Sequence, residues 1–61
     1  MSFVLFKRIL PEGESEVLVN TDNIEWVGPY KEGVLLFKML DGLSLEIKAT
    51  LSEVEEKLKG E

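Results

Sequence analysis

Apolar and polar residues alternate in short blocks along this chain, and most of the blocks predict strands. Residues 3–10 are rich in β-branched and aromatic side chains and end at Pro11, where a strand commonly stops. Residues 11–15 combine a proline with a conformationally free glycine, which predicts a hairpin loop. A second, short strand is then expected over residues 16–20.

The segment after the second strand has two interpretations. Residues 20–23 (Asn-Thr-Asp-Asn) carry side chains that hydrogen-bond to local backbone, so we expect the chain to turn there. Residues 24–27 are mainly apolar and stop at Gly28-Pro29. They form either a brief third strand or an extension of the second strand across a kink.

Asp41-Gly42 separates two further predicted strands, residues 34–40 and 43–48. An Asp-Gly pair between two such strands is the strongest short-range signal for a hairpin. A two-residue loop places Leu40 opposite Leu43 and Phe37 opposite Glu46. This register predicts one face with Val34, Leu36, Leu40, Leu43, Leu45 and Ile47, interrupted by Lys38, and another with Leu35, Phe37 and Met39 opposite Ser44, Glu46 and Lys48.

Thr50-Leu51-Ser52-Glu53 is a capping box and predicts the start of a helix. Leu51, Val54 and Leu58 form its narrow apolar stripe. The prediction for residues 1–61 is therefore a single α+β domain. It consists of a small antiparallel sheet of four or five strands, with two hairpins, and one short C-terminal helix.

The apolar residues exceed what one helix can cover. Residues 3–6 and 34–37 are apolar on both faces of their strands. In a sheet with one solvent-exposed face, apolar and polar residues alternate along each strand. A helix of about nine residues spans roughly 14 Å and covers part of one face. The excess is buried either by curling the sheet around its own core or by pairing with a second copy. We favour the homo-oligomer, with candidate interface residues Phe3, Leu5, Phe6, Trp26, Tyr30, Leu35, Phe37 and Met39.

Composition narrows the remaining classes of function. The chain has no cysteine and no histidine, which excludes disulfides and metal sites built on those residues. Its net charge is −5, and Lys7, Arg8 and Lys31 are too few for a nucleic-acid footprint, so we expect no nucleic-acid partner. No stretch approaches the ~20 apolar residues that span a bilayer, and no signal peptide is recognised. We therefore expect a cytoplasmic protein without membrane insertion.

Candidate chemistry is sparse, and we expect no enzyme, catalytic residue, metal or cofactor. Glu12, Glu14 and Glu16 share one face of an extended chain but lack the ligand spacing of a calcium loop, so a solvated loop is expected. Two alternatives stay open. A phage-encoded inhibitor of a host protein is favoured if these residues form one acidic patch with Glu53 and Glu56. An enzyme assembled at a subunit boundary requires a pocket whose carboxylates have raised pKa values.

Several segments, in order over most of the chain, resemble one family. They are Leu5-Phe6-Lys7-Arg8, residues 19–27, the Asp41-Gly42 hairpin, and residues 45–50 leading into Glu53-Val54. Together they resemble the small flagellar FlbD/SwrD-type swarming-motility proteins. The resemblance implies a non-enzymatic accessory protein that acts through contacts. The function expected is therefore that of a small acidic protein-interaction module that self-associates and has a protein partner.

Overall fold

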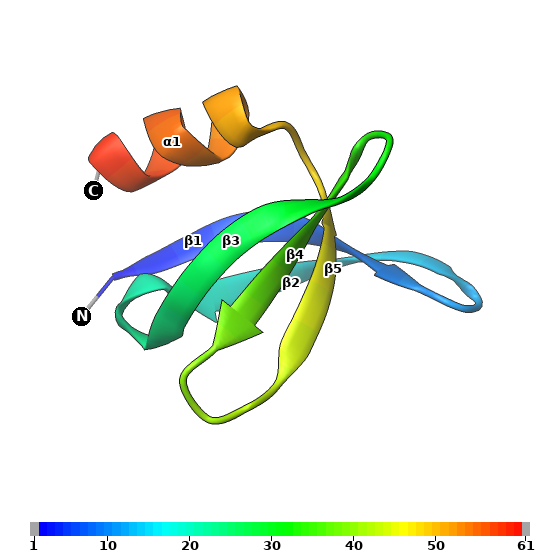
Figure 1. Cartoon of the computed structure of the whole chain (residues 1–61), viewed down its shortest axis with the longest axis horizontal. Coiled ribbons are helices and arrows are strands. Elements are labelled where there is room, and N and C mark those ends of the chain that lie inside the picture. The colour runs from blue at the N-terminus through cyan, green and yellow to red at the C-terminus, as the bar shows by residue number, and fades with distance from the viewer. Residues whose placement is uncertain (1, 61) are drawn as a thin grey trace.

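The computed structural model describes residues 2–60 as a five-stranded antiparallel sheet followed by a short helix (Figure 1). The predicted α+β fold is confirmed. The elements are β1 (Phe3–Leu10), β2 (Gly13–Asn20), the 3₁₀ turn η1 (Thr21–Asn23), β3 (Ile24–Lys31), β4 (Val34–Met39), β5 (Ser44–Lys48) and α1 (Leu51–Lys59).

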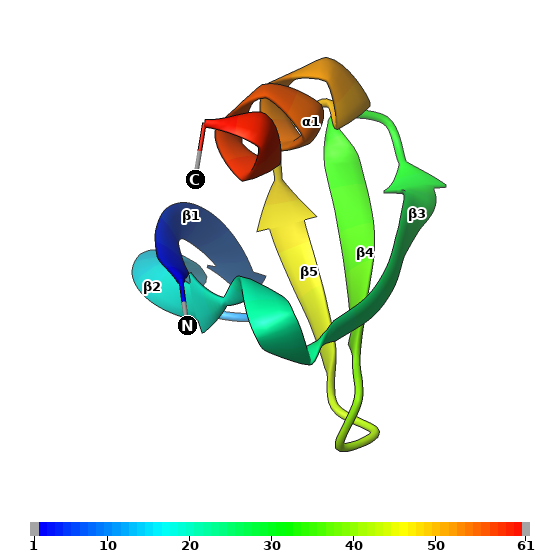
Figure 2. The same cartoon turned by 90° about the vertical axis from the view of Figure 1, so that its left-hand side faces the viewer.

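The strands lie in the order β2-β1-β5-β4-β3. The chain crosses from one edge of the sheet to the other through η1, so β2 and β3, although consecutive, are the two outer strands. Figure 2 shows the sheet strongly curled, with η1 running between its edges at one end and α1 lying over the other. The curl gives the sheet an inner side, which α1 helps to close.

Two predicted boundaries are wrong. The loop expected over residues 11–15 is a two-residue turn, because Gly13 takes a φ of 142° and already pairs with Leu10. The segment 24–27 belongs to a separate strand that continues through Gly28-Pro29 to Lys31. The turn before it forms because the Asn20 side chain accepts a hydrogen bond from the backbone N–H of Asp22 at 3.1 Å.

The predicted register of the second hairpin is also wrong, by one residue. The Met39 N–H donates to the Leu43 carbonyl at 2.8 Å, so the loop has three residues, with Gly42 at a φ of 96°. Phe37 consequently lies opposite Leu45 instead of Glu46. A slip of one residue moves every side chain of a strand to the other face, so β5 turns its leucine and isoleucine inward.

The inner side of the curled sheet holds the core, in which the Phe6 and Phe37 rings meet edge to face with centroids 5.0 Å apart. Leu35 and Met39 are buried in the same cluster. The prediction that these four residues lie at an interface between copies is wrong, because register and curl turn them into the chain's own core. The buried cluster consists of Val4, Phe6, Val19, Leu35, Phe37, Met39, Leu45, Ile47 and Val54.

The helix begins as predicted. The Glu53 N–H donates to the Thr50 hydroxyl at 3.2 Å, and the Thr50 N–H donates to the Glu53 carboxylate at 3.2 Å, which completes the capping box. Val54 is the buried residue of α1 and joins the helix to the core. Within residues 2–60, no helix has the length and apolar character needed to cross a membrane.

Candidate interaction surface

The outer face of the β1–β2 hairpin carries exposed apolar side chains. Val4 and Val19 face the core, so their neighbours in each strand face outward. Leu5 lies directly opposite Leu18, and Phe3 is two residues along β1 from Leu5 on the same face. Their exposed fractions are 52% for Phe3, 46% for Leu5 and 63% for Leu18. We call these three side chains the hairpin face.

Charged residues border the hairpin face on one side. Lys7 lies opposite Glu16 in the β1–β2 register, on the same side of the hairpin as the Leu5 and Leu18 pair. Both charged residues are exposed. An apolar centre with a charged rim is the usual composition of a protein contact surface.

Trp26 and Tyr30, the other two predicted interface residues that are exposed, lie on β3 at the opposite edge of the sheet. The Trp26 ring lies against Gly28, where an added Cβ would be 3.4 Å from the ring. The Lys31 ammonium lies 5.6 Å from the centre of the Tyr30 ring. The structure thus separates the predicted interface into a core group, the hairpin face and these two β3 aromatics.

Leu18 is the residue of this surface that the sequence analysis missed. The signal was present, because Leu18 alternates with Val17 and Val19 along β2 and cannot share their face. Its exposure depends on its partner strand. Only the register of β1 with β2 shows that Leu18 is next to another outward leucine.

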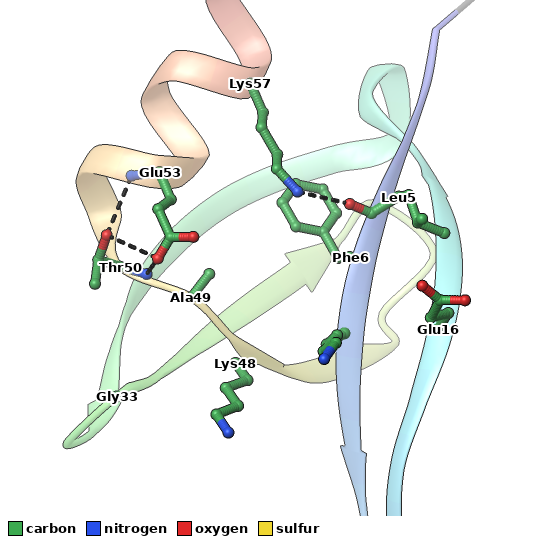
Figure 3. A pocket seen from close by; sticks show the side chains of 10 residues that line it. Leu5, Phe6, Glu16, Gly33, Lys48, Ala49, Thr50, Glu53 and Lys57 are labelled. Carbon is green, nitrogen blue, oxygen red and sulfur yellow. Dashed lines mark hydrogen bonds between the residues drawn. The ribbon is translucent and has the colours of Figure 1, made fainter.

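A pocket of about 550 Å³ opens where β1 and the segment after β5 diverge toward α1 (Figure 3). The Lys57 ammonium reaches across it from the helix, donates to the Leu5 carbonyl at 3.0 Å and lies 5.0 Å from the centre of the Phe6 ring. The pocket is lined by Leu5, Phe6, Lys7, Glu16, Gly33, Lys48, Ala49, Thr50, Glu53 and Lys57.

Charge in and beside this pocket is mixed. Lysines from β1, β5 and α1 line it together with Glu16 and Glu53, and the Glu53 carboxylate is used by the helix cap. Glu14 forms an ion pair with Lys48 at 3.1 Å. Glu14, Glu16 and Glu53 therefore lie among lysines and do not make a continuous acidic patch. Across residues 2–60, no three acidic side chains are grouped as a metal site would require.

No family model, curated protein or solved structure matches this chain. Function is therefore inferred from the residues of the hairpin face and from the strands that carry them.

Proposed function

We propose that this chain is a non-enzymatic interaction module that works by associating with a second copy of itself through the β1–β2 hairpin. The observation that carries the proposal is the hairpin face. Its three large apolar side chains are about half exposed, whereas other leucine and phenylalanine side chains are buried in the core. Clustered exposed apolar residues of this kind typically mark contact surfaces.

The energy available from this face sets a limit on how it works. Full burial of one leucine or phenylalanine side chain stabilises by about 1.5–3 kcal/mol, so burying the exposed halves of three side chains in each of two copies contributes at most about 5–9 kcal/mol. Association costs about 4–15 kcal/mol in lost translational and rotational freedom. The hairpin face alone therefore leaves little or no surplus, and a stable dimer needs a second source of affinity.

The process we propose is the one that the FlbD/SwrD resemblance implies, an accessory role in flagellar swarming motility. The module would act through contacts with its own copy and with a protein partner. In a host that encodes it, deleting the gene should reduce the diameter of swarms on soft agar without changing growth in liquid. A normal swarm would contradict the motility role and leave the self-association proposal standing.

Light scattering coupled to size exclusion tests the association. At tens of micromolar we expect a mass twice that of the 6.9 kDa chain. Leu18→Lys should shift the protein to monomer, because it places a charge at the centre of the contact. Leu40→Lys is the matched control, since Leu18 and Leu40 are both 63% exposed and Leu40 lies in the β4–β5 loop. A monomer mass for the natural protein contradicts the proposal.

A further inference from the structure

The backbone of β2 presents four residues to solvent along its free edge. The Thr21 N–H donates to the Ser2 carbonyl at 2.8 Å. Along an antiparallel strand, residues whose backbone groups point toward the neighbouring strand alternate with residues whose backbone groups point away from it. The odd-numbered residues of β2 therefore form the hydrogen bonds to β1. The outward groups are therefore those of the even-numbered residues, which are Glu14, Glu16, Leu18 and Asn20.

The opposite side of β1 supports this assignment independently. Leu5 pairs with Leu18, and by the same alternation its carbonyl points away from β2. That carbonyl accepts the hydrogen bond from Lys57 at 3.0 Å, on the far side of β1. The outward row on β2 is thus fixed by two separate hydrogen bonds.

The backbone of this edge is unprotected. Edge strands are commonly blunted by prolines, bulges, short length, charged side chains or a covering element. Charged side chains occur only in the first half of β2, at Glu14 and Glu16. β2 pairs with β1 over all eight of its residues without a bulge and contains no proline. Its first four residues, Gly13 to Glu16, are all exposed. A regular edge of this length is a template for another strand.

We infer that the strand added at this edge is β2 of a second copy, antiparallel, with Leu18 of each copy directly opposite the other on a two-fold axis. The inference rests on the proposed self-association and names its geometry. It also identifies the second source of affinity, which is the row of backbone hydrogen bonds between the two edges. The contact is isologous, as a two-fold requires.

Charge and apolar pairing together favour this register. Hydrogen bonding between the two edges requires even-numbered residues to lie opposite even-numbered ones. Centring the axis on Ser15 or Glu16 places glutamates directly opposite glutamates, which is destabilising. Centring it on Val17 also keeps the carboxylates apart, but it places the charged Glu16 against Leu18 of the second copy. Centring it on Leu18 pairs the two leucines and sets Glu16 opposite Asn20 of the second copy, so no carboxylates meet and no charge faces a leucine.

The same register makes the apolar surface continuous. Even-numbered side chains of both β2 strands lie on one face of the joined sheet, because only registers with an even sum are allowed. Leu5, opposite Leu18 in each copy, therefore flanks the central leucine pair on both sides. Val17 lies opposite Val19 of the second copy on the inner face. Backbone pairing thus joins the two hairpin faces into one apolar strip on the outside of the dimer, in which the two Leu18 side chains contact each other.

Single cysteines test the register, because the natural chain has none. In the proposed dimer Leu18→Cys places two Cα atoms about 5.5 Å apart, within the 4.4–6.8 Å range of disulfides. Glu16→Cys, the matched control in the same strand, separates the two Cα atoms by four residues, or roughly 13 Å. Tyr30→Cys, on β3, reports random collision. We expect oxidised glutathione to cross-link Leu18→Cys at least tenfold faster than either control.

The outcomes separate the two proposals. A natural protein that is dimeric by light scattering, with equal or no cross-linking in all three variants, overturns edge pairing and leaves self-association standing. Faster linking of Glu16→Cys than of Leu18→Cys overturns the register. A monomeric natural protein overturns both. If a foreign protein occupies this edge instead, the natural chain alone stays monomeric and no variant links faster than Tyr30→Cys.

Discussion

The two outer strands of the sheet differ in how they expose their free edges. β2 has eight residues in unbroken register with its neighbour, whereas β3 has two register shifts, one between Ile24 and Trp26 and one between Pro29 and Lys31. Bulges of this kind twist an edge and interrupt its row of hydrogen-bonding groups. The backbone of β3 is thereby interrupted at both ends, whereas the backbone of β2 is interrupted at neither.

Proline completes the protection of β3. The Leu40 N–H donates to the Asn23 carbonyl, just before β3, and the Met39 N–H donates to the Leu43 carbonyl, just before β5. Alternation along β4 therefore turns Leu35 toward β5. Pro29 lies opposite Leu35, so its nitrogen, which has no hydrogen, faces the free edge. The edge that the chain leaves open is the edge beside the hairpin face.

The largest effects are expected from proline substitutions at two neighbouring positions of β2, made one at a time. Glu16→Pro removes an N–H that points outward, so we expect a folded monomer where the natural protein is a dimer. Ser15→Pro removes the N–H that faces Arg8 and leaves a carbonyl of β1 unpaired, which costs about 1–3 kcal/mol. Light scattering measures the mass, and thermal unfolding should show a Tm at least about 4 °C lower for Ser15→Pro alone.

Each of the two proline variants is the control for the other, because they differ only in whether the lost N–H points outward or toward β1. If both variants have the same Tm, the assignment of inward and outward N–H groups in β2 is wrong. If Glu16→Pro stays dimeric, the contact lies away from this edge, and the contrast between the two outer strands has no functional consequence.

Local signals in the sequence predicted much of the fold. The capping box at Thr50 and Glu53 and the hairpin at Asp41-Gly42 both form, because each depends on a few adjacent residues. The register of that hairpin failed for a physical reason. Asp-Gly suits both a two-residue and a three-residue loop, and both need a positive φ at Gly42. The longer loop leaves Asp41 without a positive φ and turns Ile47 into the core.

The sequence predicted two of the three side chains of the hairpin face, Phe3 and Leu5, but not Leu18. Phe3 and Leu5 were identified because the strands carry more apolar side chains than one short helix can bury. The same reasoning also selected Phe37, which is fully buried in the core. Sequence periodicity separates the two faces of a strand without showing which face the curl encloses. Leu18 was missed for the related reason that its outward leucine partner comes from another strand.

Opening the β3 edge is expected to have a smaller effect. Pro29→Val restores an outward N–H two residues from that of Val27, so a second template for pairing appears. We expect species larger than the dimer at the highest concentrations, detected by light scattering. Tyr30→Val introduces the same side chain next to it without adding a donor, and should leave the mass unchanged. An unchanged mass for Pro29→Val would show that the bulges alone protect β3.

The smallest effect is expected at the hairpin end of β2. Lys48→Met removes the ion pair between Lys48 and Glu14, whose side chains are 59% and 41% exposed, and such pairs contribute about 0–1 kcal/mol. Urea denaturation should therefore show little loss, as for Lys59→Met, which removes the 3.8 Å pair with Glu55. Because the register centred on Leu18 pairs residues 16–20 only, freeing Glu14 should leave the dimer dissociation constant within about twofold. A larger change would mean that the pairing extends to Glu14, as the register centred on Val17 requires.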